Sequence, residues 1–397
     1  MNLSQRALMM PASPIRRLVP YAEKAKARGI KVYHLNIGQP DIETPQEILD
    51  GYKKIDIKVL EYGHSAGLKS YIQTLVQYYQ QVGIAVQAED ILVTTGGSEA
   101  ISFALKAICD PGEEVIVPEP FYTNYLGFAI MAGVKIVPVL TRPETGFALP
   151  NKDEFKKLFT SKTRAILFSN PNNPTGAVYT TQEMETLRQL ALENDLFLIG
   201  DEVYREFVYD DTAALSVLNL KGIEDRAVMI DSISKRYSAC GARIGCVISR
   251  NKQFMATMLK FGQARLCPPT IDQLAAQQAS KIPPSYFEQV RNEYRLRRDV
   301  LCAELKKIPG VKFLPPKGAF YLIAGLPVDD AERFAIFMLN DFNLDNETVM
   351  LSPGNGFYAT PGMGKSEVRI AYVLKREQLI QAVEIIDAGL KAYPGRG

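Results

Sequence analysis

Between residues 90 and 249, short apolar runs rich in β-branched residues alternate with segments of helical pattern. A strand that is apolar at nearly every position is buried on both faces, which is typical of a parallel sheet covered by helices. The segments 98–108 and 121–133 have the pattern of such helices. The repeat therefore predicts an α/β fold with a mostly parallel sheet. The predicted strands are 90–95, 114–120, 135–140, 165–171, 196–203, 227–234 and 243–249.

The pattern changes near residue 284. Residues 284–308 carry apolar side chains at helical spacing with charges opposite, over a length sufficient to connect two domains. A smaller α+β unit follows, and the Pro-interrupted segment 1–44 is expected to pack on it. Because 397 residues exceed one compact core, we predict two domains, a large one at 45–295 and a small one formed by 1–44 and 296–397. In the small domain we predict strands at 311–314, 319–326, 348–354 and 367–374, a helix at 331–342 and a final helix that carries Leu379 to Leu390.

Composition excludes several classes of function. The net charge of +2 gives no indication of a nucleic-acid or membrane-surface partner. No apolar run has the length of a membrane span, and the first residues lack the apolar core of a signal peptide, so we expect a cytoplasmic protein. The five cysteines form no CxxC pair and are expected to be reduced thiols. Two histidines argue against a metal site and against Ser-His-Asp chemistry, so catalysis falls to Lys, Asp, Tyr, Arg and hydroxyl groups.

Two motifs that directly follow predicted strands are rich in residues typical of turns. GGSEA, at 96–100, opens a helix, and its N–H groups with the Ser98 hydroxyl form either an anion site or a simple capped turn. It is not GxGxxG, so a nicotinamide dehydrogenase lacks its glycine fingerprint here. SNPNNPTG, at 169–176, is either a turn or a ligand-binding loop at a strand end, where an Asn amide would bind a phenolate-like oxygen.

Two further motifs place charged groups after strands. In GDEVY, Asp201 would be a buried carboxylate that needs a cationic or N–H partner, either a ligand or a nearby arginine. In DSISKRYSACGARIG, at 231–245, Ser232 and Arg243 suit a phosphate, and Lys235 would be a nucleophilic amine close to it. Phosphate donors, an Asn amide, a buried carboxylate and an amine together match the phosphate, ring hydroxyl, ring nitrogen and aldehyde of pyridoxal 5'-phosphate.

The order of these motifs resembles a known family. With G-x-P-D at 38–41, Y-x-x-x-x-G at 62–67 and R-I-A at 369–371, the set is similar to class I aminotransferases of the aspartate aminotransferase superfamily, through nearly the whole chain. The resemblance implies pyridoxal-phosphate fold type I, with a mostly parallel seven-stranded sheet sandwiched by helices and a smaller α+β domain. It also implies a homodimer with shared active sites.

The resemblance assigns the catalytic residues. Lys235 matches the lysine that binds the cofactor as a Schiff base, and Asp201 matches the aspartate that keeps the ring nitrogen protonated. Asn173 and Tyr204 match the pair at the ring hydroxyl. Arg369 matches the arginine that binds the substrate α-carboxylate.

The resemblance also assigns the other contacts. Tyr122 matches the aromatic ring stacked on the cofactor, and Tyr62 the tyrosine that reaches a phosphate of the partner subunit. Gly38 lies near the substrate, together with Asn173. The phosphate ligands implied are Gly97, Ser98, Ser232 and Arg243.

This sequence departs from the family at two places. Ala242 stands where the family often has Trp before the phosphate-binding arginine, and Tyr122 stands where many relatives stack a Trp. The second arginine that some aspartate enzymes use for the side-chain carboxylate is not placed by any motif. Arg16 and Arg265 are candidates, although each is more typical of a surface or structural residue.

The predicted activity is ping-pong transfer of an amino group from an L-amino acid, with aspartate preferred, to a 2-oxo acid, with 2-oxoglutarate preferred. Aminotransferases for aromatic amino acids, alanine, kynurenine or prephenate remain alternatives. The same scaffold supports β-elimination from cysteine-like substrates and aminocyclopropane-type chemistry. A ligand-sensing module that binds pyridoxal phosphate without turnover is the non-enzyme alternative, and the filled catalytic positions argue against it.

Overall fold

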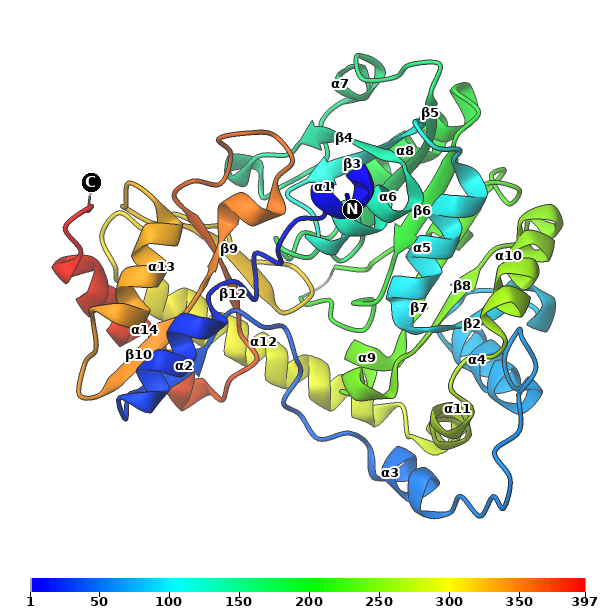
Figure 1. Ribbon diagram of the computed structural model, residues 1–397, viewed down its shortest axis with the longest axis horizontal. Helices are drawn as coiled ribbons and strands as arrows, with labels where there is room; N and C mark the ends of the chain where they lie inside the picture. Colours follow the sequence, from blue (N-terminus) through cyan, green and yellow to red (C-terminus); the bar gives the residue numbers. More distant parts are fainter. Residues whose placement is uncertain (1, 211, 397) are drawn as a thin grey trace.

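The computed structural model describes residues 2–210 and 212–396, which form two lobes connected by a long helix (Figure 1). The larger lobe contains a seven-stranded sheet with the strand order β2-β8-β7-β6-β5-β3-β4. Each strand overlaps one of the seven strands predicted from the apolar runs. The strands are β2 (Ile91–Thr95), β3 (Glu114–Glu119), β4 (Lys135–Leu140), β5 (Thr163–Ser169), β6 (Phe197–Asp201), β7 (Ala227–Ser232) and β8 (Ile244–Ile248).

The sheet is mostly parallel. β8 runs antiparallel to its neighbours β2 and β7, and the other neighbouring pairs are parallel. Along β5, Ile166 and Phe168 belong to one hydrophobic core, whereas Ala165 and Leu167 belong to another. Since successive side chains of a strand point to opposite faces, both faces of the sheet are buried. The predicted α/β fold is confirmed.

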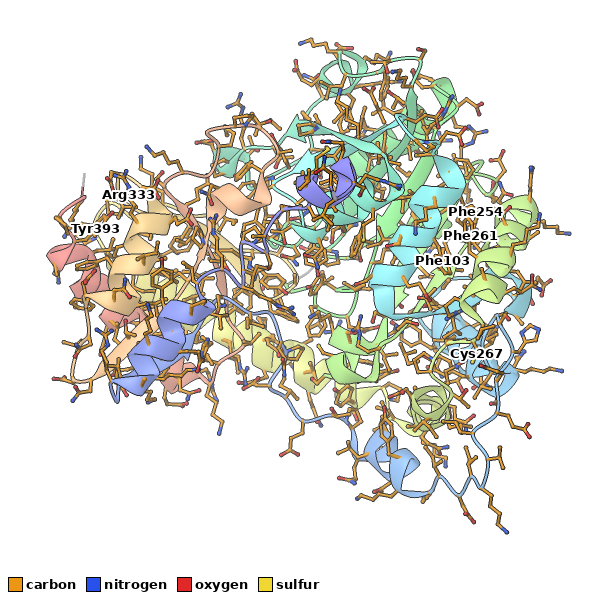
Figure 2. All side chains as sticks on the ribbon, in the orientation of Figure 1. Phe103, Phe254, Phe261, Cys267, Arg333 and Tyr393 are labelled. Atoms are coloured by element: carbon orange, nitrogen blue, oxygen red, sulfur yellow. The ribbon has the colours of Figure 1, made fainter. Side chains whose placement is uncertain are left out.

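Helices cover the two faces. α4 (Lys69–Gln81) and α8 (Thr181–Glu193) contribute to the first core, and α5 (Gly96–Ile108), α6 (Asn124–Ala132) and α10 (Lys252–Arg265) to the second. Figure 2 shows Phe103 of α5 beside Phe261 of α10, and their ring centroids are 5.5 Å apart. The other helices of this lobe are α3 (Gln46–Lys53), α7 (Lys152–Lys156), α9 (Ile233–Arg236) and α11 (Thr270–Ala276). No helix in the described part of the chain is both long enough and apolar enough to cross a bilayer.

The smaller lobe is built on an antiparallel sheet with the strand order β11-β12-β9. The long helix α12 reaches it from the larger lobe and packs against α14 (Figure 1). The predicted apolar stripe of α12 is buried at Val290, Tyr294, Leu301 and Leu305. The elements are α12 (Ser285–Leu305), β9 (Tyr321–Gly325), α13 (Ala331–Asn340), β11 (Ser352–Pro353), β12 (Glu367–Ala371) and α14 (Arg376–Ala392).

The predictions for the smaller lobe need three corrections. β1 (Lys31–His34) was not predicted, and it pairs in parallel with β10 (Glu347–Met350). The strand predicted at 311–314 is wrong, because only an isolated bridge forms there, between Lys312 and Gly325. Two prolines follow at 315 and 316, and proline has no N–H to extend a ladder. The strand predicted at 348–354 is divided between β10 and β11, which belong to different sheets.

Residues 10–18, which we call the strap, connect the lobes near the N-terminus. Before the strap, α1 (Gln5–Met9) lies on the larger lobe, where Arg6 Nη1 donates to the Met131 carbonyl at 3.5 Å. After it, α2 (Val19–Ala27) packs against α13. Within the strap, Arg17 Nη2 lies 2.8 Å from the Glu332 carboxylate. The strap is therefore held at both ends.

A buried ionic cluster supports the end of β7. The Asp231 carboxylate accepts a hydrogen bond from Arg236 and another from the Tyr79 hydroxyl at 2.7 Å, and it lies 3.5 Å from Arg205 Nη1. Arg236 is only 3% exposed. Removing one partner of such a pair leaves an uncompensated buried charge. We therefore expect Asp231→Ala to lower the free energy of unfolding by about 3–5 kcal/mol, measured by urea titration.

Asp225→Ala is the matched control. This carboxylate pairs with Arg226 but is largely exposed, so its loss is expected to cost less than about 1 kcal/mol. Equal losses for the two variants would contradict the assignment of a buried cluster.

Candidate active site

A cavity of about 630 Å³ lies where β5, β6 and β7 end, and the strap and the strand β12 also contribute to its wall. The carboxyl ends of parallel strands are the usual ligand sites of open α/β sheets. All residues that the resemblance assigned to the site, except Tyr62, line this cavity. Of the two candidate arginines, Arg16 lines it and Arg265 does not. The lining residues that were predicted are Gly38, Gly97, Ser98, Tyr122, Asn173, Asp201, Tyr204, Ser232, Lys235, Arg243 and Arg369.

One end of the cavity is suited to an anion. Gly97 and Ser98 lie in the first turn of α5, where N–H groups lack intrahelical partners. The Arg243 side chain packs against Gly96, where a Cβ atom would lie 2.3 Å from Nη2. Gly96 also has a φ of +73°, so only glycine fits without strain. The start of α5 and the Arg243 guanidinium are therefore packed against each other.

Ser232 and Lys235 lie at the same edge of the sheet, beside this helix start. The Ser232 hydroxyl accepts from the Ser234 N–H at 3.1 Å and lies 2.8 Å from the Ile244 carbonyl oxygen. The short helix α9 carries Lys235 into the cavity, and its Nζ donates to the Gly38 carbonyl at 2.8 Å. The amine therefore faces the ligand space and is bonded to the backbone on its far wall.

Asp201 provides the one carboxylate among the described residues that line the cavity. It ends β6 and is 5% exposed. Its carboxylate accepts from the Tyr125 hydroxyl at 2.5 Å and from the Val203 N–H at 3.4 Å, and no described lysine or arginine pairs with it. Burial raises the pKa of Asp201 to about 6, while the hydrogen bond from Tyr125 acts in the opposite direction.

Another part of the cavity wall is a chain of hydrogen-bonded side chains, which runs from Arg369 through Asn173 and Tyr204 to Tyr321. Arg369, which is 1% exposed, donates from Nη1 to Asn173 Oδ1 at 3.0 Å, and Asn173 Nδ2 lies 3.5 Å from the Tyr204 hydroxyl. Tyr204 shares a 2.8 Å hydrogen bond with Tyr321. Burial lowers the pKa of Arg369 and raises the pKa of Tyr204. Nε of Arg369 is buried and has no hydrogen-bond partner in the described residues, so this guanidinium retains donor capacity.

Sequence reasoning missed two tyrosines of the site. The Tyr125 hydroxyl donates to Asp201. In the sequence Tyr125 lies three residues after Tyr122 in a predicted helix, and this spacing places the two side chains on the same face, which could have identified Tyr125 as a site residue. Tyr321 lies in the apolar strand β9, under the guanidinium of Arg369 at 4.5 Å, and the sequence gives no polar signal for it. A Cβ atom on Gly38 would lie 1.8 Å from the Tyr321 hydroxyl, so glycine is needed there. Tyr62, by contrast, is 80% exposed and lies outside the cavity wall.

Residues 30–386 match the family model for aminotransferase class I and II. The chain belongs to this family. It is 32% identical to the aspartate aminotransferase of Pyrococcus abyssi, across 98% of this chain and 99% of that protein. It is 31% identical to the aromatic-amino-acid aminotransferase 2 of Thermococcus litoralis, across 98% and 99%. The solved alanine aminotransferase of Pyrococcus furiosus is 29% identical, with a TM-score of 0.90 across 99% of this chain and all of that one.

The predicted aminotransferase activity is therefore confirmed at the level of the family. These three aminotransferases are named for different amino donors, although each is about equally similar to this chain. The amino donor of this aminotransferase must therefore be inferred from the side chains that line its own cavity.

Proposed function

We propose that this chain is a pyridoxal-phosphate-dependent aminotransferase that moves the amino group of L-aspartate to 2-oxoglutarate. The observation that carries the proposal is the Asp201 carboxylate, which is buried in a cavity beside Lys235 and has no cationic partner in the described residues. A buried carboxylate without a cation is costly unless a ligand supplies one. The protonated ring nitrogen of pyridoxal phosphate is such a cation, so the residues present fit this cofactor.

The other lining residues fit the remaining groups of the cofactor. Asn173 and Tyr204 would bind the ring hydroxyl, and Tyr122 would lie on the ring face. When bound, pyridoxal phosphate supplies an aldehyde for the amino group and a ring that accepts electrons from the α-carbon. The residues that would bind the phosphate are Gly97, Ser98, Ser232 and Arg243.

Three features of the chain would act on the substrate. Arg369 binds the α-carboxylate through two N–H groups, which fixes the direction of the bonds at the α-carbon. Lys235 takes the α-proton as general base and returns it as general acid. The strap, which is held at both lobes, would limit the access of water to the site.

We propose that the active form is a homodimer in which Tyr62 completes the site of the partner subunit. Tyr62 lies in an exposed apolar segment with Ile57, Val59 and Leu60, and clustered exposed apolar residues are typical of interfaces. Sedimentation as a monomer at micromolar concentration would contradict this proposal. We also propose that residues 45–295 form one domain and that 1–44 with 296–397 form the other, in line with the pairing of β1 with β10. The exception is α1, which packs on the larger lobe rather than on the smaller one.

The proposed reaction is tested with a panel of amino acids, 2-oxoglutarate and added pyridoxal phosphate, with glutamate as the measured product. We expect glutamate to form fastest from aspartate, with parallel lines in double-reciprocal plots at varied acceptor concentration, because a ping-pong reaction uses one site twice. Release of pyruvate and ammonia from cysteine-like substrates without an acceptor would instead identify a β-lyase. Faster transfer from alanine, kynurenine or an aromatic donor, or faster transfer to prephenate than to 2-oxoglutarate, would contradict the proposed substrates.

A further inference from the structure

The side chain of Tyr321 is held in one position in the cavity wall. It is 2% exposed, and the guanidinium of Arg369 lies over its ring, 4.5 Å from the ring centroid. The ring of Tyr204 meets it edge to face, with the two centroids 5.5 Å apart. A Cβ atom on Gly38 would lie 1.8 Å from the Tyr321 hydroxyl, so the Gly38 backbone lies against this hydroxyl. The hydroxyl of Tyr321 therefore has a fixed place beside Tyr204.

The hydrogen bonds of this wall determine which atoms donate. An arginine side chain has only donors, so the atom of Asn173 that faces Arg369 at 3.0 Å is the amide oxygen, Oδ1. The amide nitrogen, Nδ2, then faces the Tyr204 hydroxyl at 3.5 Å, and an amide nitrogen can only donate. The Tyr204 oxygen therefore accepts a hydrogen bond from Asn173.

The hydroxyl of Tyr321 has one hydrogen-bond partner within residues 2–210 and 212–396, the Tyr204 hydroxyl at 2.8 Å. A buried hydroxyl whose proton has no acceptor costs free energy, so the Tyr321 proton is directed at the Tyr204 oxygen. With the bond from Asn173, the Tyr204 oxygen then accepts two hydrogen bonds, which uses both acceptor sites of a hydroxyl. The proton of Tyr204 is left to be donated into the cavity, which Tyr204 lines.

The surroundings of Tyr204 keep this proton in place at neutral pH. Burial raises the pKa of Tyr204 well above its ordinary value, and the neighbouring phenols of Tyr321 and Tyr122 act in the same direction. The charge of Arg369 acts in the opposite direction and is the smaller effect. Tyr204 is therefore a neutral donor whose direction depends on the hydroxyl of Tyr321.

We propose that Tyr321 is a positioning residue that directs the proton of Tyr204 to the ring hydroxyl oxygen of the cofactor. This inference rests on the proposed function, in which Tyr204 binds that oxygen. A donor at the oxygen stabilises the deprotonated, anionic form of the bound cofactor. Loss of the Tyr321 hydroxyl should therefore raise the pH at which the bound cofactor loses its proton.

The test compares Tyr321→Phe with Tyr372→Phe, since each removes one buried hydroxyl from the smaller lobe. Tyr372 donates to the Ala319 carbonyl at 3.2 Å and does not line the cavity. The absorbance of pyridoxal phosphate bound to each protein is titrated against pH without substrate. For Tyr321→Phe we expect the midpoint to rise by about 0.5–1 pH unit, because the deprotonated form loses an oriented donor. Tyr372→Phe should leave the midpoint unchanged.

Tyr204→Phe separates the donor from the residue that orients it. This variant should raise the midpoint further than Tyr321→Phe does, since it removes the donor itself. A rise in Tyr321→Phe as large as that in Tyr204→Phe would overturn the proposed order of hydrogen bonds. A midpoint in Tyr321→Phe equal to that in Tyr372→Phe would overturn the role of Tyr321.

A measurement on the cofactor-free protein tests the hydrogen bond itself. Urea titrations are compared for Tyr204→Phe, Tyr321→Phe and the variant that carries both substitutions. Because either substitution breaks the same bond, we expect the double variant to lose less stability than the sum of the two single losses. Additive losses would overturn the bond between the two hydroxyls. Failure of the unmodified protein to bind pyridoxal phosphate would instead overturn the proposed function, and the urea titrations would still report on the bond.

Discussion

Lys235→Ala is expected to abolish aminotransfer. Its Nζ is the one primary amine among the described residues of the cavity wall, and it is held by the Gly38 carbonyl at 2.8 Å. Without it the site lacks both the amine that would bind the cofactor aldehyde and the proposed general base at the α-carbon, and no histidine is among the described residues that line the cavity. We expect kcat to fall by at least about 10⁴, measured as glutamate formed from aspartate and 2-oxoglutarate.

A second measurement on this variant separates chemistry from folding. Borohydride treatment should add the mass of the reduced cofactor to the peptide that contains Lys235 in the unmodified protein, and to no peptide of the variant. Lys260→Ala, which removes an exposed lysine of α10, is the control and should retain both activity and labelling. Turnover of Lys235→Ala within tenfold of the unmodified protein, or labelling at another lysine, would remove Lys235 from its proposed role.

The strands of the larger sheet could be predicted because all except the edge strand β4 are buried along most of their length, which produces a nearly continuous apolar run. The strand ends could be predicted as the site because a polar residue at the end of a buried apolar run lies at the edge of the sheet, where α/β proteins bind ligands. Asp201 at the end of β6 and Ser232 at the end of β7 are examples. The smaller lobe was harder, because the pairing of β1 with β10 joins segments more than 300 residues apart and each strand has only four residues.

Two features of the site depend on tertiary contacts that local sequence pattern does not indicate. Tyr321 lies within an apolar strand, and its position between Tyr204 and Arg369 depends on how the two lobes meet. Arg16 and Arg17 are adjacent and identical in type, and only the structure shows that one faces the cavity and the other faces Glu332. Local pattern carries no information on such a difference, because it arises from contacts between segments that are distant in the chain.

Asp201→Asn is expected to reduce catalysis while stabilising the cofactor-free protein. Asparagine keeps the shape of the side chain but cannot hold a ring nitrogen in its protonated form by charge. Removing one preorganised electrostatic group of this kind typically costs about 3–4 kcal/mol of barrier, so we expect kcat to fall by about 10²–10³. The measurement is the single half-reaction with aspartate at saturating cofactor. A fall of less than threefold would contradict the proposed contact between Asp201 and the ring nitrogen.

The stability of the cofactor-free protein should change in the opposite direction. Burial raises the pKa of Asp201 to about 6, against about 4 in the unfolded chain, so between these values the folded state binds the proton more tightly. The contribution of this group to stability is therefore fully present below pH 4 and is lost as the pH rises through 6. At pH 7.5 Asp201→Asn should raise the free energy of unfolding by roughly 2–3 kcal/mol, and the gain should vanish near pH 4. A carboxylate with only a structural role would give a destabilised variant at pH 7.5, so urea titrations at the two pH values distinguish a ligand-binding carboxylate from a structural one.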